Sequence, residues 1–184
     1  MVATLASCGR QSPEEQVREG HTHHDTEITE EDLNSPKSIK REAHGQIGQN
    51  HFTIHYFSPG VRGRVIWGGL VAMNQLWVTG AHQATNVEFT EPIAVEGQTV
   101  PAGRYAFFTI PGEDKWTLIL NKNWDQHLAD DYDEELDVLR LDVSPQEVAD
   151  TERLEYSIEK TGDNEGEIQM RWENLQVTLP FQNM

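Results

Sequence analysis

Residues 103–121 read GRYAFFTIPGEDKWTLILN, and this stretch decides the fold class. Large apolar residues alternate with smaller or more polar ones on both sides of Pro111–Asp114, a segment of turn-forming residues. A period of two residues is typical of strands, and a short turn between two such runs predicts a β-hairpin. We therefore expect antiparallel strands over 103–110 and 115–121.

One face of this hairpin should lie in the core, because side chains alternate between the two faces of a strand. The residues that we expect inside are Phe89, Tyr105, Phe107, Trp116, Leu118 and Leu120. Phe108 and Ile110 are also apolar but belong to the opposite face, which indicates that this strand is covered on both sides.

The alternation continues outside the hairpin. In residues 51–57 (HFTIHYF), Phe52, Ile54 and Tyr56 share one face, which is typical of a half-buried strand. Other apolar runs separated by turn residues predict strands at 63–67, 75–79, 85–90, 93–95, 137–143, 153–159, 166–172 and 175–180, with a turn at Glu173–Asn174. Many short strands predict an all-β domain over residues 51–184. We expect an antiparallel β-sandwich, with a jelly-roll arrangement or a barrel as alternatives.

Short helices are expected at two places. Trp124, Leu128 and Tyr132 recur every four residues within 122–136, as in a helix that packs on a sheet. Thr29 and Asp32 have the spacing of a capping box, which predicts the start of a second helix.

The charge limits the functional classes. The chain of 184 residues has 31 Asp and Glu against 14 Lys and Arg, giving a net charge of −17. Nucleic acid is therefore not an expected partner, because its phosphates require clustered Lys and Arg. No apolar run approaches the ~20 residues that cross a bilayer.

Residues 1–8 (MVATLASC) resemble a signal remnant that ends in a bacterial lipobox, Leu5 to Cys8. We expect Cys8 to carry lipid, which makes the membrane a partner through a lipid anchor. The seven residues before Cys8 contain no Lys or Arg and are shorter than a usual signal peptide, so an unmodified thiol is the alternative.

Residues 9–50 are polar and predict a disordered, flexible N-terminal tether. His21, His23 and His24 are weak candidates for metal ligands. A flexible tail does not preorganise a site, so we expect a solvated tail, no metal and no cofactor.

Short catalytic motifs are absent. The sequence contains no G-x-S-x-G, P-loop, G-x-G-x-x-G or H-E-x-x-H pattern, and we assign no catalytic residue. Two classes of function stay open. One is a non-enzymatic module that binds a ligand or assembles with a protein partner. The alternative is a hydrolase of glycans or esters whose site is not encoded in a short motif.

The candidate binding site combines two segments. Arg62 and Arg64 flank a glycine after a turn, and their spacing places both on one face of a strand. Each guanidinium suits a carboxylate or phosphate. In the next segment Trp77 can stack a ligand, while Thr79 and His82 can form hydrogen bonds. We expect a small anionic or sugar-like ligand between the segments; ion pairs to internal acids are the structural alternative for the arginines.

Several stretches resemble one known family: SPGVRGRVIWGGLV, LWVTGAHQATNVEF, VEGQTVPAGRYAFFTIPGEDKWTLILNKNW, DVLRLDV and ERLEYSIE. They are similar to a bacterial lipoprotein family catalogued as domain of unknown function 2911, common in Bacteroidota. The resemblance implies a secreted, commonly lipid-anchored all-β domain. With the lipid anchor, we expect an extracytoplasmic location at the outer membrane, with the periplasmic and the cell-surface face both open. The family usually has Trp-Arg-x-Gly-Ala-Asn where this chain has Trp77–His82, so Val78 and His82 differ.

Overall fold

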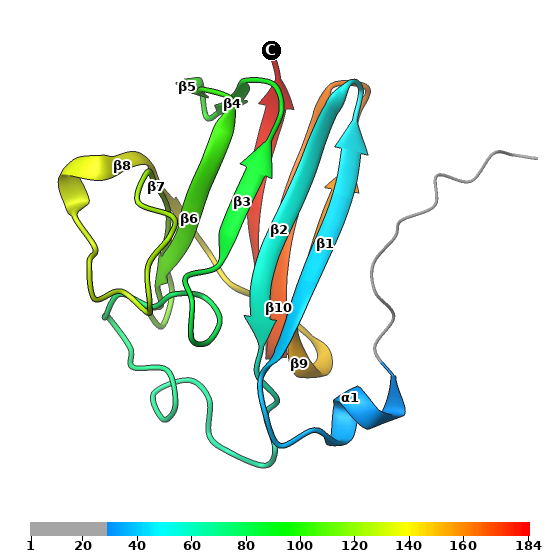
Figure 1. The fold of residues 1–184 in the computed structure, drawn as a ribbon, viewed down its shortest axis with the longest axis vertical. Coiled ribbons are helices and arrows are strands. Elements are labelled where there is room, and N and C mark those ends of the chain that lie inside the picture. Colours follow the sequence, from blue (N-terminus) through cyan, green and yellow to red (C-terminus); the bar gives the residue numbers. More distant parts are fainter. Residues whose placement is uncertain (1–28) are drawn as a thin grey trace, which may run out of the picture.

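The hairpin of residues 103–121 forms strands β6 (Gly103–Ile110) and β7 (Trp116–Asn121), which pair antiparallel as predicted. The computed structural model describes residues 29–184 and confirms a β-sandwich of two antiparallel sheets (Figure 1). No helix in this described part is long and apolar enough to cross a membrane.

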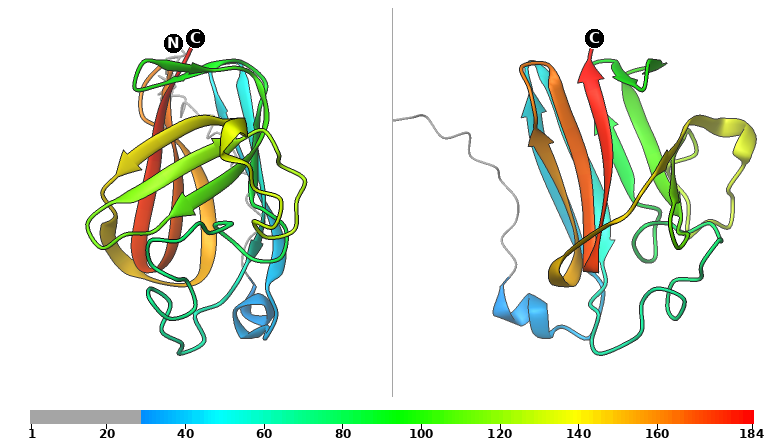
Figure 2. Two further views of the ribbon diagram at one scale, coloured as in Figure 1. Left: turned by 90° about the vertical axis from the view of Figure 1, so that its left-hand side faces the viewer. Right: turned by 180° about the vertical axis from the view of Figure 1, so that it is seen from behind.

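The larger sheet has six strands in the order β1-β2-β3-β6-β7-β8. Its other members are β1 (Ile39–Ile47), β2 (Asn50–Ser58), β3 (Asn86–Phe89) and β8 (Asp137–Val143). The second sheet has the order β5-β4-β10-β9, with β4 (Ile93–Val95), β5 (Gln98–Val100), β9 (Gln146–Lys160) and β10 (Glu165–Asn183). Figure 2 shows β6, β7 and β8 crossing the long strand β10 obliquely, as expected for twisted sheets.

The core between the sheets contains all six residues predicted for it, from Phe89 to Leu120. Phe107 lies against Tyr156 of β9, with 5.9 Å between ring centroids. The opposite face of β6 is also covered: Phe108 and Ile119 belong to a second apolar cluster and are fully buried. This confirms that β6 is enclosed on both sides.

The segment that covers this second cluster does not form the helix predicted over 122–136. Residues 122–133 are irregular, and only a 3-10 turn, Glu134–Leu136, follows. Asn and Asp side chains favour such turns because they bond the local backbone in place of helical partners. Here the Asn121 amide donates to the carbonyl of Asp133 at 2.8 Å, and the Asn123 amide donates to that of Asp131 at 3.0 Å.

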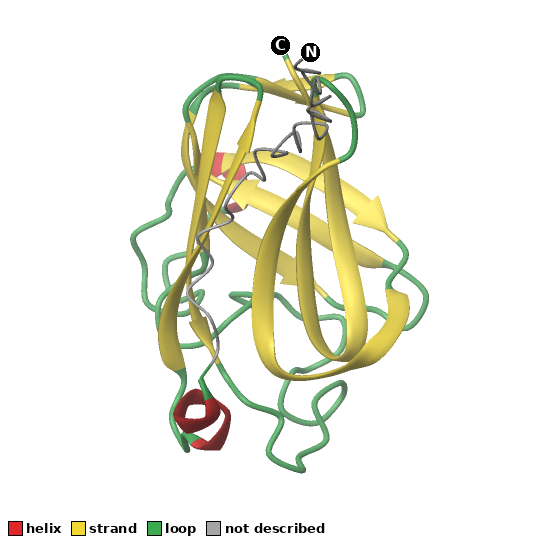
Figure 3. Ribbon diagram, turned by 90° about the vertical axis from the view of Figure 1, so that its right-hand side faces the viewer, coloured by secondary structure: helices red, strands yellow, loops and turns green. Residues whose placement is uncertain are grey.

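The ordered domain begins earlier than the predicted boundary at residue 51. Strand β1 lies within the segment expected to be a flexible tether, and it pairs with β2 along its whole length. Its many charged residues resemble a polar tail, but Ala43 and Ile47 face the core. Before it, the predicted capping box of Thr29 and Asp32 is present and starts α1 (Glu30–Asn34), at one end of the sandwich (Figure 3). Cys8, His21, His23 and His24 lie outside the described residues.

The longest connection, between β2 and β3, contains no strand, although strands were predicted at 63–67 and 75–79. Only isolated bridges occur in it, such as Trp77 to Thr109. Positive φ angles at Arg62, Asn74, Thr79 and His82 break the extended backbone that a strand requires. A turn predicted at Glu173–Asn174 is also absent, because β10 continues through it with a bulge.

Candidate functional site

A cavity of about 700 Å³ lies where the β2–β3 connection meets the segment after α1. Both elements gather at the same end of the sandwich, opposite the C-terminus (Figure 1). Four of the five predicted site residues line it, namely Arg62, Arg64, Trp77 and His82. The structure thus brings together two segments that the sequence could only suggest were neighbours.

Three cationic side chains line the cavity, and no Asp or Glu of residues 29–184 is among its lining. Two of them are the predicted Arg62 and Arg64; the third, Lys37, was not predicted. Within the described residues no carboxylate lies within ion-pairing distance of these three side chains. The carboxylate of Glu152 is close by, but it accepts the backbone N–H of Arg62 at 2.9 Å and does not line the cavity.

The two guanidinium groups are held by backbone carbonyls. Arg62 Nη1 donates to the carbonyl of Pro36 at 2.5 Å, and Arg64 donates to the carbonyls of Gly60 and Val61. An arginine has five N–H donors, so each keeps donors for another acceptor. The arginines therefore stabilise the turn and remain charged groups at the cavity.

The Trp77–His82 segment is fixed from several sides. Trp77 exchanges backbone hydrogen bonds with Thr109 of β6, at 2.8 and 3.0 Å. The carbonyl of Thr79 accepts from the hydroxyls of Tyr156 at 2.8 Å and Thr85 at 2.9 Å. Burial raises the pKa of the Tyr156 phenol well above its usual value, so this donor stays protonated.

Thr79 itself does not line the cavity. Its side chain is fully buried, and its hydroxyl lies 3.1 Å from the hydroxyl of Thr109. The φ of 51° at this β-branched residue is unusual and turns the side chain into the protein. We therefore leave Thr79 out of the site. Gly80 is needed for internal packing, because a Cβ there would lie 2.7 Å from the Thr85 hydroxyl.

Apolar and aromatic side chains form the remaining walls: Leu70, Val71, Trp77, Val78, Leu128 and Trp172. Trp77 stacks on Trp172 with 5.8 Å between ring centroids and an interplanar angle of 20°. The His82 ring meets Phe57 edge to face at 5.2 Å. Val78 and His82, where this chain differs from the usual family segment, both line the cavity.

Some residues of the cavity wall have an unusual backbone conformation. Of the non-glycine residues with positive φ among residues 29–184, Arg62, His82 and Leu128 line the cavity. Such conformations persist only where surrounding contacts impose them, and they are frequent at ligand sites.

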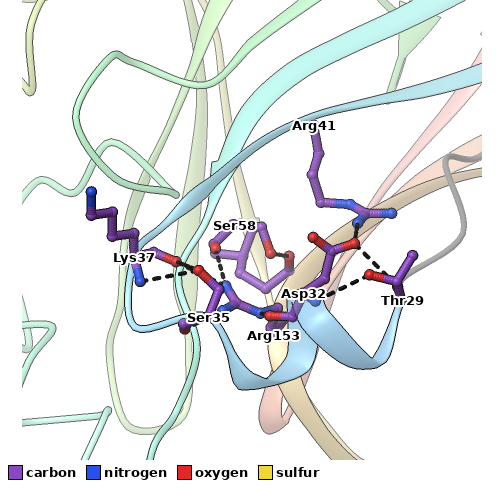
Figure 4. A network of polar contacts seen from close by, with 8 residues as sticks. Thr29, Asp32, Ser35, Lys37, Arg41, Ser58 and Arg153 are labelled. Carbon is purple, nitrogen blue, oxygen red and sulfur yellow. Dashed lines mark hydrogen bonds and ion pairs between the residues drawn. The ribbon is translucent and has the colours of Figure 1, made fainter.

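A buried arginine positions the wall that carries Lys37 (Figure 4). Arg153 of β9 is 1% exposed and donates to four carbonyls: Asp32 at 2.5 Å, Ser35 at 2.6 Å, Ser58 at 2.8 Å and Lys37 at 3.3 Å. Burial lowers the pKa of its guanidinium. Sequence reasoning missed Arg153, because nothing local distinguishes it in the segment TERLEYSIE.

Asp32, whose carbonyl accepts from Arg153, also connects the cavity wall that carries Lys37 to β1. The Asp32 carboxylate lies 3.9 Å from Arg41, and hydrogen bonds from the backbone and side chain of Thr29 hold the pKa of Asp32 below its usual value. No group of three or more His, Cys, Asp and Glu in residues 29–184 is arranged to hold a metal ion.

Comparison with known proteins identifies one family. The model described as "Protein of unknown function (DUF2911)" matches residues 37–181, which confirms the resemblance inferred from the sequence. No curated protein and no solved structure gave a match.

Proposed function

We propose that this chain, which belongs to the family Protein of unknown function (DUF2911), is an extracytoplasmic binding module that holds a small organic anion in the cavity of Arg62, Arg64 and His82. A lipid on Cys8 would tether it to a membrane. The family resemblance and the lipobox-like residues support the tether, and the cavity supports the binding.

The observation that carries this proposal is the local charge. The chain has a net charge of −17, yet the cavity lining contains three cations and no acid among residues 29–184. Clustered like charges repel one another, so they are retained where a ligand of opposite sign offsets the repulsion. An arginine fork also matches a carboxylate or phosphate with two parallel hydrogen bonds.

The apolar walls narrow the chemistry of the ligand. Inorganic phosphate would leave the exposed side chain of Leu70 and the accessible part of the half-buried Trp77 without a ligand contact. A ligand with a flat apolar face would cover them, because indole rings stack on such faces. An anion joined to a sugar or aromatic ring has both properties.

The hydrolase alternative finds less support in this cavity. Glycoside hydrolysis generally uses a pair of carboxyl groups beside the scissile bond. The lining offers no carboxylate within residues 29–184. A binding role requires only the cations and the apolar walls that line the cavity.

The proposal is tested by calorimetric titration with two matched pairs, glucuronate against glucose and phenyl phosphate against phenol. We expect at least one anion to bind while its neutral counterpart does not, with affinity that falls as salt is added. Lys37→Met removes a charge whose ammonium group forms no hydrogen bond or ion pair within residues 29–184, and His82→Ala removes a ring at the cavity. Each should weaken binding about tenfold, since a charge-assisted hydrogen bond contributes about 1.5 kcal/mol or more.

Lys122→Met is the matched control, because Lys122 is exposed and does not line the cavity. It should bind as the unmodified protein does. The proposal is wrong if neither anion binds, or if Lys37→Met and Lys122→Met have equal effects.

A further inference from the structure

A second cavity, of about 320 Å³, lies on the outer face of the six-stranded sheet. Its lining comes from β1, β2, β3 and β6, which are neighbours in the sheet (Figure 1), from the end of the β2–β3 connection and from the segment after β7. It differs from the first cavity in its charge. Lys40 and Arg104 are balanced there by Glu42 and Asp125.

Four polar side chains of this second cavity are held in two pairs, His55 with Glu42 and Arg104 with Asn86. His55 Nδ1 lies 2.9 Å from a carboxylate oxygen of Glu42. Arg104 donates to the side-chain carbonyl of Asn86 at 2.7 Å, and its guanidinium covers the Trp124 ring at 4.0 Å. Donors, acceptors and an aromatic ring therefore line one small space without excess charge of either sign.

Two chain segments run directly from the first cavity into the second. Residues 36–38 line the first, and Lys40 and Glu42 of the same segment line the second. Residues 80–82 line the first, and Gln83 and Ala84 line the second. Lys40 is two residues of extended chain, roughly 7 Å, beyond residue 38, and Gln83 directly follows His82, so the cavities are within reach of one elongated molecule.

Two aromatic rings connect the cavities: Phe57, which lines the second cavity, contacts His82, which lines the first, edge to face with 5.2 Å between ring centroids. Backbone hydrogen bonds to residues 126–128 fix this segment, from Ala84 to the carbonyl of Gln126 at 3.0 Å and from Leu128 to that of His82 at 2.7 Å.

We propose that the two cavities are subsites for one acidic oligosaccharide: an anionic sugar in the first and a neutral sugar in the second. This inference rests on the proposed function, because it assigns the anion to the first cavity. A neutral sugar presents hydroxyl groups that both donate and accept, which suits the balanced charges and the mixture of donors and acceptors around Arg104 and Glu42.

The position of the second cavity argues for a sugar over a peptide. Extended peptides commonly bind by adding a strand to the edge of a sheet, through main-chain hydrogen bonds. This cavity lies on the face of the sheet, where β2, β3 and β6 pair with neighbouring strands on both sides and β1, the edge strand, pairs with β2. Recognition must therefore come from side chains.

The test compares four probes by calorimetric titration: glucuronate, a disaccharide of glucuronate and glucose, the same disaccharide with its carboxyl group reduced, and an acidic dipeptide. The disaccharide is tested in two forms, one with glucuronate at the reducing end and one with glucose there. We expect the acidic disaccharide to bind at least tenfold more tightly than glucuronate, and the reduced one to bind weakly or not at all.

The double variant Gln83→Ala/Asp125→Ala probes the second cavity. Both side chains are exposed and form no recorded hydrogen bond or ion pair in residues 29–184. The affinity for the acidic disaccharide should fall to that for glucuronate, whereas the affinity for glucuronate should not change. The control is Gln75→Ala/Asp114→Ala, at exposed positions outside both cavities.

The outcomes separate the two proposals. If glucuronate and the acidic disaccharide bind equally well and both depend on Lys37, the anion site stands and the second subsite is refuted. If an acidic dipeptide binds more tightly than the disaccharide and depends on Gln83 and Asp125, the glycan assignment is overturned. If no anion binds, both proposals fail.

Discussion

Replacing Arg153 by Met should detach the wall of the cavity that carries Lys37. The guanidinium is buried and donates to the carbonyls of Asp32, Ser35, Lys37 and Ser58 at 2.5 to 3.3 Å (Figure 4). Methionine keeps an unbranched apolar chain in the same space but removes every donor. Three of these carbonyls, those of Asp32, Ser35 and Lys37, belong to the segment after Thr29. Within residues 29–184 their one other side-chain donor is the Ser35 hydroxyl, which lies a marginal 3.5 Å from the carbonyl of Lys37.

The loss of unfolding free energy can be estimated from these four hydrogen bonds. A hydrogen bond from a charged donor contributes about 1.5–3 kcal/mol, so four would contribute at least about 6 kcal/mol if they were additive and the carbonyls stayed dry. They will not stay dry, because residues 33, 34, 36 and 37 are exposed and a detached segment regains water. Removing the buried charge also relieves its desolvation, which lowers the pKa of Arg153 in the fold. We expect a net loss of about 2–4 kcal/mol, somewhat below the value for breaking a buried ion pair.

Two measurements test this expectation. Urea titration should give the loss of unfolding free energy, and hydrogen exchange should show lost protection at residues 30–38 while the amides of β6 stay protected. Arg171→Met is the control: Arg171 is half-buried and its recorded partners are the side chains of Gln169 and Gln176. A loss below about 1 kcal/mol for Arg153→Met, with unchanged exchange at 30–38, would refute the reasoning.

Three further changes have defined outcomes. Phe107→Ala should lower the unfolding free energy by about 3–5 kcal/mol in denaturant titration, because the ring is buried between the sheets; a loss near 1 kcal/mol would contradict this. Burial, followed by the hydrogen bond to Asp137, raises the pKa of Tyr132 to about 12, so its contribution to stability is present below pH 10 and lost as the pH rises toward 12. Tyr132→Phe should reduce that decline in thermal melts; an unchanged decline would assign it to other groups. Expressed with a membrane-competent signal, the protein should partition into detergent, and Cys8→Ala should release it; mass spectrometry that finds an unmodified Cys8 would refute the anchor.

The hydrophobic pattern predicted the sandwich well where one face of a strand is apolar. β6, β7 and β8 appear close to their expected bounds, because alternation is the direct consequence of a half-buried sheet. The same criterion failed at β1, where only Ala43 and Ile47 face the core between charged neighbours. Pairing with β2 and contact with β9 hold this strand in place, and a sequence window of a few residues contains neither partner. One sign of that contact is Gly45, where a Cβ would lie 2.6 Å from Ile158.

The cavity itself was only partly predictable, since it joins residues that are far apart in the chain. Lys37, Leu128 and Trp172 come from three separate segments and carry no local signal that relates them to Arg62. Arg153, which holds Lys37 in place, is equally remote. The two arginines could be selected from the sequence, because neighbouring guanidinium groups are unusual in so acidic a chain. Which other side chains lie beside them depends on the fold.

Arg62 and Thr79 were both expected on strands, and the structure places both in the β2–β3 connection with positive φ. Strand alternation was expected to place Arg62 and Arg64 on one face, and a strand was also expected over 75–79, yet neither segment is a strand. Arg62, with φ 54°, precedes Gly63 at φ 66°, and this turn brings both arginines to the cavity. At Thr79 the same left-handed conformation turns the side chain away, and Tyr156 and Thr85 hold the carbonyl. Sequence reasoning therefore grouped four residues that line the cavity with a fifth that does not, because the backbone of this connection follows local φ angles that hydrophobic patterns do not encode.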